Sequence, residues 1–283
     1  MSGRLVVCPT PIGNLEDITL RVLAALREAD VIAAEDTRHT RGLLERYGVS
    51  APLVSYHEHN EERRAAELVE RMRAGSVVAL VSDAGMPLIS DPGYVLVRAC
   101  VGAGLAVEVL PGPSAAISAL VASALPSDSW RFAGFLPRKR GDLERVLSEA
   151  GGTLVAFESP KRVPATLAVL AAIDPERQTA VCRELTKLHE EIVRGTAAEL
   201  AARYADAPPR GEVVLVVAPA APPTAGEVAA PPSAVDAVSR LVAAGAKRRV
   251  AAGVVAELTG ASANALYKAV ADAERGAGPT SSS

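Results

Sequence analysis

Aromatic residues, cysteines and long apolar runs are all scarce in this sequence. Phe, Trp and Tyr make up 3% of its 283 residues, and its three cysteines, Cys8, Cys100 and Cys182, are widely separated. Distant cysteines in an odd number, without a CxxC pair, favour reduced thiols in the core of a cytosolic protein. No apolar run approaches the ~18 to 20 residues of a membrane span. The first residues also lack a charged segment followed by an apolar one, so we expect no membrane association and a cytoplasmic location.

An excess of basic charge is absent as well. Lys and Arg number 30 against 33 Asp and Glu, which gives a formal net charge of -3. No overall basic field therefore indicates nucleic-acid binding, and any such contact must come from a local patch. The hydrophobic content of 49% is typical of a globular protein, and 283 residues suffice for two domains with separate cores.

Short apolar runs alternate with helical patterns in the first part of the chain. Four apolar runs predict strands, at 4–9, 31–35, 77–82 and 106–112, and two segments have helical spacing, 19–28 and 93–103. The run VVALV is apolar throughout, as are strands of parallel sheets that are buried on both faces. This alternation predicts an α/β fold with a mostly parallel sheet.

A second α/β series follows a change in composition at 127–137. We expect an N-terminal α/β domain at 1–125, a second α/β domain at 126–217, an Ala/Pro-rich linker at 218–233 and a helical module at 234–283. In the module, Gly260 and Ser262 supply a helix stop and an N-cap, so its last two helices form a helix-turn-helix-like pair. Contact with RNA or the ribosome is one interpretation of this module, and dimer packing or regulation is the other.

Each predicted strand of the first domain ends in an unusual turn. The four turns have the sequences PTPIGN, AEDTRHT, SDAGMPLISDPG and LPGPSA. One such turn is usually only a connection, but the carboxyl ends of parallel strands meet at one edge of the sheet, where ligands bind. Four special turns at that edge predict a ligand site. Because Gly13 is the only glycine in the first turn, the GxGxxG pattern of dinucleotide binding is missing.

The stretch SDAGMPLISDPG contains two turns with different predicted roles. Small residues in Asp83-Ala84-Gly85 let the backbone approach a ligand. Asp91-Pro92-Gly93 is expected to begin the next helix, with Asp91 as its N-cap and Pro92 in its first position.

Charged side chains follow the second predicted strand. Glu35 and Asp36, with two arginines on the next turn, could orient a polar substrate, although Asp36 could instead only cap the following helix. His39 and the HEH triplet at 57–59 offer no third ligand at a recognisable spacing, so we predict no metal site.

Eight segments together resemble the ribosomal RNA small subunit methyltransferase I family. They occur in order from about residue 5 to 217: TPIGNLEDIT, AEDTRHTRGLL, SDAGMPLISDPG, LPGPSA, FAGFLPRK, FESPKR, RELTKLHEEIVRG and GEVVLVV. The resemblance implies a two-domain tetrapyrrole-methylase-like fold and 2'-O-methylation of a cytidine in 16S rRNA. The C-terminal module also resembles the helix-turn-helix appendage of many members.

The resemblance implies S-adenosylmethionine as cofactor, in a deep cleft between the two α/β domains. The cofactor would be bound mainly by backbone groups of loops. The positions that match the family's cofactor loops are Pro11, Ile12, Gly13, Asp83, Ala84, Gly85, Ser114, Ala115, Phe135, Leu136, Leu185, Gly211 and Glu212.

Catalysis would consist mainly in placing a ribose hydroxyl in line with the methyl group, since a sulfonium leaving group needs little help. A base, or a cation that stabilises the developing oxyanion, would make that hydroxyl a better nucleophile. The candidates are Asp36 and Glu35 at one rim of the cleft and Glu158, Lys161 and Arg162 at the other. Lys161 stands where the family commonly has His, and this departure argues against a family-wide proton transfer there.

The partner implied by the resemblance is 16S rRNA within the small ribosomal subunit, with a homodimer as the oligomeric state. RNA affinity depends largely on phosphate contacts, for which the candidates are Arg38, Arg41, Arg138, Lys139, Arg140, Lys247, Arg248 and Arg249. Two alternatives stay open: a methyltransferase of the same superfamily acting on a tetrapyrrole or a modified protein side chain, and a non-catalytic RNA-binding relative.

Overall fold

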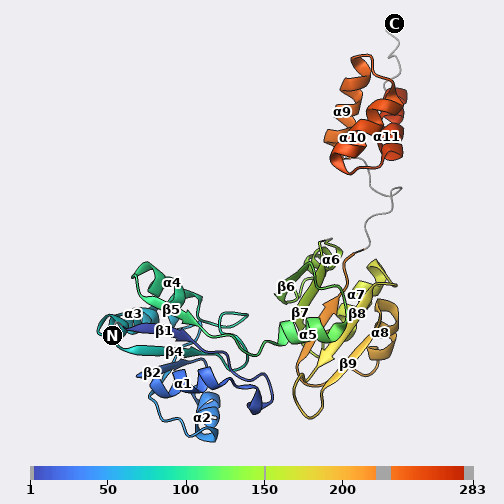
Figure 1. Ribbon diagram of the computed structural model, residues 1–283. Coiled ribbons are helices and arrows are strands. Elements are labelled where there is room, and N and C mark those ends of the chain that lie inside the picture. Colours follow the sequence, from blue (N-terminus) through green and yellow to red (C-terminus); the bar gives the residue numbers. More distant parts are fainter. Residues whose placement is uncertain (1–2, 150, 221–230, 277–283) are drawn as a thin grey trace. The chain divides into compact units, whose positions relative to one another are not determined.

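The computed structural model describes residues 3–149, 151–220 and 231–276 (Figure 1). The chain forms two compact units, 1–220 and 221–283. Residues 221–230 of the predicted linker and 277–283 of the predicted module lie outside the described residues. Within the described part, the first unit contains two five-stranded sheets and the second contains helices alone. The prediction of an α/β fold with a helical C-terminal module is confirmed.

The first sheet is parallel throughout, with the strand order β3-β2-β4-β1-β5. Its strands are β1 (Arg4–Val7), β2 (Val31–Ala34), β3 (Leu53–Ser55), β4 (Val77–Val81) and β5 (Ala106–Val109). The chain crosses from β1 past β4 to β2 and later from β4 past β1 to β5. The carboxyl ends of β1 and β4 therefore flank the position where the strand order reverses, which is where open α/β sheets bind ligands.

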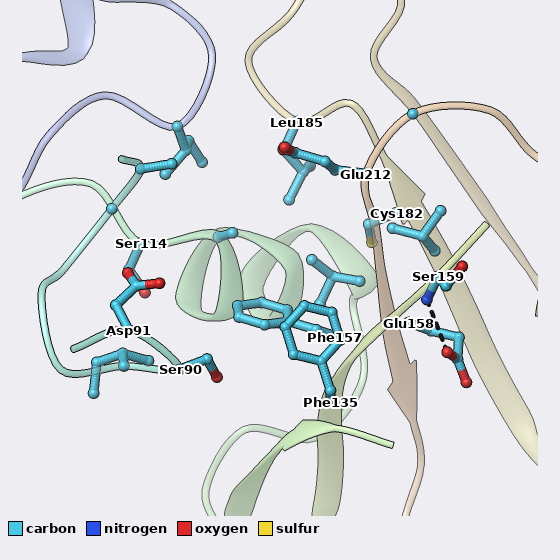
Figure 2. A pocket seen from close by; sticks show the side chains of 18 of the residues that line it. Ser90, Asp91, Ser114, Phe135, Phe157, Glu158, Ser159, Cys182, Leu185 and Glu212 are labelled. Carbon is cyan, nitrogen blue, oxygen red and sulfur yellow. Dashed lines mark hydrogen bonds between the residues drawn. The ribbon is translucent and has the colours of Figure 1, made fainter. Parts of the chain in front are cut away.

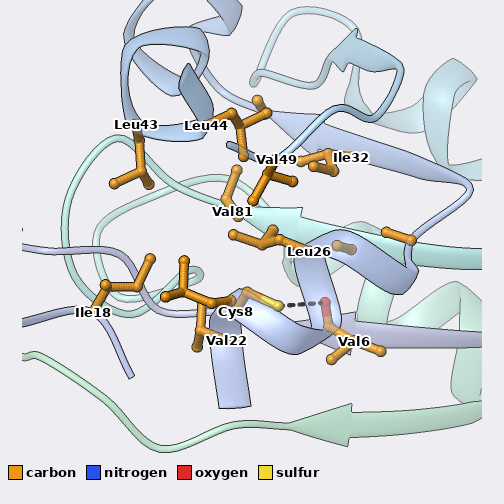
Figure 3. Close-up of a cluster of buried hydrophobic side chains, with 14 of the residues drawn as sticks. Val6, Cys8, Ile18, Val22, Leu26, Ile32, Leu43, Leu44, Val49 and Val81 are labelled. Atoms are coloured by element: carbon orange, nitrogen blue, oxygen red, sulfur yellow. Dashed lines mark hydrogen bonds between the residues drawn. The ribbon is translucent and has the colours of Figure 1, made fainter. Parts of the chain in front are cut away.

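Helices cover both faces of this sheet, as the alternation of side chains along a buried strand requires (Figure 1). These are α1 (Leu20–Glu28), α2 (Thr37–Arg46), α3 (Glu61–Arg73) and α4 (Tyr94–Gly102), with a short 3₁₀ helix η1 (Leu15–Asp17) before α1. Val6 and Cys8 pack under α1 and α2, whereas Leu5 and Val7 pack under α3 and α4. Figure 3 shows Cys8 inside the first of these clusters. All three cysteines are buried free thiols.

The second sheet is mixed, with the order β6-β7-β10-β8-β9. Its strands are β6 (Trp130–Phe135), β7 (Thr153–Glu158), β8 (Gln178–Arg183), β9 (Glu191–Thr196) and β10 (Val213–Val217). Only the β6–β7 pair is parallel, and β10 runs antiparallel to both of its neighbours. Because of this direction, Val213 at the start of β10 lies opposite Glu158 and Arg183 at the ends of β7 and β8.

Helices α6 (Arg140–Ser148), α7 (Val163–Ile173) and α8 (Ala197–Tyr204) cover one face of the second sheet. The other face packs against α5 (Ala115–Ser123), which contributes Ala116, Ala119 and Leu120. By its packing α5 thus belongs to the second sheet, although the predicted boundary after residue 125 groups it with the first domain. The boundary itself stays a prediction.

The second unit contains α9 (Pro232–Ala243), α10 (Arg248–Thr259) and α11 (Ala263–Gly276) around a small apolar core. Gly260 ends α10 in the left-handed region, with φ of 70°, and the Ser262 hydroxyl accepts a hydrogen bond from the Ala265 N–H. Both end signals predicted for this helix pair are therefore confirmed. Across the described residues, no helix combines the length and the apolar character needed to cross a membrane.

Of the two N-caps predicted in the first unit, one agrees with the structure and the other does not. The Asp36 carboxylate accepts from the Arg38 N–H at the start of α2, as predicted. At α5 the N-cap is Ser114. The prediction that Asp91 caps α4 is wrong, because that helix begins later and its N-cap is Gly93, with φ of 139°. A Cβ at Gly93 would lie 2.8 Å from Leu88 Cδ1, so this tight turn requires glycine. Because the helix begins only after the turn, Asp91 lies outside it.

Candidate functional site

A pocket with mostly apolar walls lies among the loops that follow β1, β4 and β5 and the neighbouring ends of strands in the second sheet (Figure 2). It encloses about 320 Å³, a volume typical of small-molecule sites. Its lining residues are Ile12, Ala84, Gly85, Met86, Ile89, Ser90, Asp91, Ser114, Ala115, Phe135, Phe157, Glu158, Ser159, Pro160, Cys182, Leu185, Gly211, Glu212, Val213 and Val214. Most of this wall is apolar or small.

The loops after β1 and β4 are joined directly to each other. The Thr10 N–H donates to the Gly85 carbonyl at 2.9 Å, and the Gly85 N–H donates back to the Thr10 carbonyl at 3.0 Å. The Thr10 hydroxyl also donates to the Ser82 carbonyl at 3.0 Å. Gly85 has φ of 78°, which favours glycine. Its backbone groups thus fix one wall of the pocket.

The opposite wall is built where β10 returns between β7 and β8. The Glu184 carboxylate accepts from Lys187 Nζ at 2.8 Å and from the Glu212 N–H at 2.9 Å, and these hydrogen bonds lower the pKa of Glu184. Gly211 has φ of 81°, and a Cβ there would lie 2.3 Å from Glu184 Cδ. Glycine is therefore required for Glu184 to join the loop after β8 to the start of β10.

Aromatic rings form a third part of the wall. Phe157 contacts Phe132 and Phe135 edge-to-face, with centroid distances of 4.9 and 5.5 Å. Phe135 is 63% exposed, the largest exposure among the three phenylalanines. A face of this kind suits a flat apolar or π-bonded part of a ligand.

Nine of the thirteen residues predicted to bind the cofactor line the pocket: Ile12, Ala84, Gly85, Ser114, Ala115, Phe135, Leu185, Gly211 and Glu212. The other four lie behind the lining or beside it. Pro11 is buried, and Leu136 packs in the core under α6 and α7. Asp83 turns toward the end of β2, where its Oδ1 accepts from the Asp36 N–H at 3.0 Å.

Gly13 lies against the loop that follows β8. A Cβ at this position would lie 2.4 Å from Lys187 Cγ, 2.9 Å from Thr186 Oγ1 and 3.1 Å from the Leu185 carbonyl oxygen. The neighbouring Asn14 N–H donates to that Thr186 hydroxyl at 3.0 Å. Because Gly13 has no side chain, the loop after β1 can approach the loop after β8 at the edge of the pocket.

The predicted catalytic residues do not gather at one point. Glu158 lines the pocket, but its carboxylate accepts from Thr166 Oγ1 at 2.7 Å and from the Ser159 N–H at 2.8 Å. Its Oε1 also lies 3.3 Å from Arg162 Nη1. Lys161 is exposed, and Asp36 is an exposed helix cap. None of Lys161, Asp36 and Glu35 is among the lining residues.

Asp91 is the pocket residue whose role sequence patterns miss. Burial, followed by the negative charges of Glu35 and Asp83, raises its pKa to about 6, against the lowering effect of a hydrogen bond from Ser82. The pKa of Glu35 is raised by the same causes, burial first and the charge of Asp83 next. The repeated Asp in SDAGMPLISDPG is the signal that could have indicated a carboxylate pair at this loop.

Seven of the eight predicted RNA-binding residues are exposed, and Arg248 is half-buried. Arg38 and Arg41 are exposed on α2, and Arg138 and Arg140 line a second hollow of about 400 Å³ beside α6 and α7, together with Arg162. Lys139 is exposed next to them. In the second unit Lys247 and Arg249 are exposed, and the Arg248 guanidinium lies over the Tyr267 ring at 5.6 Å.

The histidine-rich segment is engaged in local contacts. His57 Nε2 lies 3.2 Å from Asn60 Nδ2, and its ring contacts that of His59 edge-to-face. Among the described residues, no group of three or more His, Cys, Asp or Glu side chains is placed to hold a metal ion.

Comparison with known proteins defines the class to which this fold and pocket belong. The family model of tetrapyrrole (corrin/porphyrin) methylases matches residues 4–201. The crystal structure of uroporphyrin-III C-methyl transferase from Thermus thermophilus, complexed with S-adenosyl homocysteine, covers 76% of this chain and 97% of its own. Its TM-score is 0.54 at 22% sequence identity, which shows a shared fold. The protein is thus a tetrapyrrole-methylase-type α/β protein.

Closer relatives identify the family within that class. A protein of Micromonospora olivasterospora is 44% identical over 286 residues, which cover 100% of this chain and 91% of the relative. One of Thermotoga maritima is 45% identical over 217 residues, which cover 76% of this chain and 98% of the relative. Both are named ribosomal RNA small subunit methyltransferase I. The chain belongs to this family.

Proposed function

We propose that the protein transfers a methyl group from S-adenosylmethionine to the ribose 2'-hydroxyl of a cytidine in 16S rRNA of the small ribosomal subunit. The observation that carries the proposal is the identity of 44% with a relative of that family over the whole chain. The homodimer and the cytoplasmic location stay predictions.

The pocket fits S-adenosylmethionine in size and in the chemistry of its walls. Ala84 and Ala115 leave room near the β4 and β5 loops, and Phe157 and Leu185 offer apolar surface to an adenine ring. We propose that these residues and Ile12 hold the cofactor, which supplies the methyl group as a sulfonium. The chain's own task is then to place the ribose hydroxyl and to exclude water.

Exposed arginines beside α6 and α7 support an RNA substrate over a small tetrapyrrole. Arg138 and Arg140 line the hollow beside α6 and α7, and Arg140 pairs with Glu144 at 2.8 Å across one helical turn. Such an exposed pair is weak and leaves the guanidinium free to rearrange toward a phosphate. We propose that this hollow contacts the RNA backbone near the target nucleotide.

Methylation of isolated small subunits tests the proposed function. The purified protein is incubated with S-adenosylmethionine and with small subunits from cells that lack the protein, and the rRNA nucleosides are analysed by mass spectrometry. We expect one new 2'-O-methylcytidine per subunit. A methyl group on a base, or no transfer to subunits with a protein that binds the cofactor, contradicts the proposal.

We also propose that the helical second unit contributes nonspecific contacts with RNA. Lys247 and Arg249 are both exposed at the start of α10. The Thermotoga maritima relative aligns over 98% of its own length with only 76% of this chain. We therefore propose that these contacts increase the affinity for RNA and take no part in methyl transfer.

The double variant Lys247→Gln/Arg249→Gln tests the contribution of the second unit. Each lost phosphate contact lowers the salt dependence of binding, so the slope of log affinity against log salt is expected to fall by about 1.5 in magnitude. Filter binding to 16S rRNA between low and moderate salt measures the slope. Glu257→Gln, on the same helix, is the control, and an equal slope in all three proteins contradicts RNA contact at α10.

A further inference from the structure

The loop between β8 and β9, residues 184–190, exposes a large apolar side chain to solvent. Leu188 is 92% exposed, the highest value for a large apolar side chain among the described residues. A single exposed apolar residue is common on protein surfaces and needs no explanation by itself. The importance of Leu188 therefore depends on where the loop lies and on how firmly it is held.

The residues just before Leu188 attach the loop to the edge of the pocket. Leu185 and Glu212 both line the pocket (Figure 2). The Thr186 hydroxyl accepts a hydrogen bond from the loop after β1 at 3.0 Å. Lys187 Nζ lies 3.1 Å from Glu212 Oε2. Leu188 follows directly, so it lies at the mouth of the pocket and not on a remote surface.

The backbone of the loop is closed on itself. Glu184 and Thr186 have φ of 51° and 66°, in a region that residues other than glycine rarely adopt. The Thr186 N–H donates to Glu190 Oε2 at 2.6 Å, and the Lys187 N–H donates to the Glu184 carbonyl at 3.0 Å. Strained backbone of this kind persists where the surrounding structure determines it and is concentrated at functional sites. A loop that is already ordered also loses little entropy when a partner binds.

The open side of the pocket is apolar in other segments as well. Phe135 at the end of β6 and Ile89 in the loop after β4 both line the pocket and are exposed. Leu15, at the start of η1, is exposed too and follows Asn14, whose N–H makes the contact with the loop between β8 and β9. The mouth of the pocket therefore offers apolar surface from several segments.

The proposed function leaves part of the substrate at this mouth. A volume of about 320 Å³ suits one small molecule, so with the cofactor bound the nucleotides that flank the target stay outside the pocket. Unpaired RNA exposes the faces of its bases, and leucine is one of the side chains that pack against base faces. Lys187, next to Leu188, is already paired with Glu184 and Glu212. The tip of the loop thus suits a base better than a phosphate.

We propose that Leu188 packs against the base of a nucleotide that flanks the target cytidine and so positions the target ribose at the pocket. The inference rests on the proposed function and names a surface that recognises its substrate. Leu188 contributes binding and orientation, and no proton or methyl group passes through it.

Leu188→Ala tests the proposal with full-length protein and isolated small subunits. We expect KM for the subunits to rise about tenfold, as for the loss of one buried leucine contact. The contact is the same in the ground state and the transition state, so kcat should stay within about threefold of wild type. Leu188 is not among the lining residues, so the Kd for S-adenosylmethionine should not change. Leu188→Met keeps the apolar volume and should retain the wild-type KM.

Val101→Ala is the matched control. Val101 is also a strongly exposed apolar residue, and it lies in the last turn of α4. That helix returns the chain toward the start of β5, at the edge of the first sheet opposite the pocket. We expect wild-type kinetics from this variant. Equal KM values for Leu188→Ala and Val101→Ala would overturn the proposal.

Photo-crosslinking identifies what Leu188 contacts. A benzophenone amino acid takes the place of Leu188, and the full-length protein is irradiated in complex with small subunits and S-adenosylmethionine. We expect an adduct on a 16S rRNA nucleotide next to the methylated cytidine, and no RNA adduct from the same group in place of Val101. A crosslink from position 188 to a ribosomal protein, or to a second copy of the chain, assigns the loop to a protein interface and overturns the RNA contact.

The outcomes separate this inference from the proposed function. If the wild-type protein methylates small subunits and Leu188→Ala has an unchanged KM, the role of Leu188 is wrong and the function stands. A rise in KM that weaker cofactor binding explains also overturns the role. If the wild-type protein does not methylate small subunits, the proposed function falls, and the crosslink from position 188 then decides by itself whether the loop contacts RNA.

Discussion

Gly13→Ala is expected to weaken the binding of S-adenosylmethionine about tenfold. The added Cβ would lie 2.4 Å from Lys187 Cγ and 2.9 Å from Thr186 Oγ1. Neither group can simply move away, because Lys187 is paired with Glu184 and Glu212, and Thr186 accepts from the Asn14 N–H. The loop after β8 must shift as a unit and carry Leu185, which lines the pocket.

Overpacking of this kind costs about 1–3 kcal/mol, and about 1.4 kcal/mol corresponds to a tenfold change in Kd. Isothermal titration of the variant with S-adenosylmethionine measures the effect. Gly42→Ala is the matched control, since a Cβ at this position in α2 meets nothing within 4 Å. We expect its Kd to equal that of wild type. Equal affinities for the two variants would show that the contact at Gly13 does not shape the pocket.

The parallel first sheet is predictable because its main strands are short buried runs between helical patterns. Each of β1, β2 and β4 is almost wholly buried, so nearly every residue in it must be apolar. This reasoning does not apply to β3, because its three residues lie half-buried at the edge of the sheet. The sequence LVS therefore carries too weak a signal to distinguish it from a loop.

The mixed second sheet is harder to derive, because direction and register are set by tertiary pairing. Nothing local in VVLVV indicates that β10 lies antiparallel between β7 and β8. That arrangement nevertheless brings Gly211 and Glu212 to the same pocket as Phe135 and Leu185. The family resemblance supplies these positions, whereas periodicity alone does not.

The roles of the acidic residues depend on geometry that local patterns do not contain. An Asp-Pro pair before a helical segment is typical of an N-cap, but the turn at Gly93 moves the helix start and frees Asp91 for the pocket. Likewise Glu158 at a strand end is a reasonable catalytic candidate until its contact with Thr166, eight residues later on α7, is known.

Glu158→Ala is expected to lower the free energy of unfolding by about 3 kcal/mol. The wild-type side chain is fully buried and accepts from Thr166 Oγ1 and the Ser159 N–H. Alanine leaves these donors without an acceptor, and each buried unsatisfied group costs about 1–3 kcal/mol. Arg162 also loses its counter-charge, but it is 29% exposed and still donates to the carbonyls of Leu136 and Pro137. Its share of the loss should therefore be small.

Two further variants separate the buried network from ordinary loss of a charge. Glu158→Gln can accept from the Ser159 N–H and donate its amide to the Thr166 hydroxyl, so we expect it to lose only about 1 kcal/mol. Glu144→Ala removes an exposed carboxylate from the pair with Arg140 on α6, and such pairs contribute about 0–1 kcal/mol. Urea unfolding at neutral pH measures all three. If Glu158→Ala is no less stable than Glu144→Ala, the carboxylate does not hold β7 to α7, and its place beside the pocket requires another explanation.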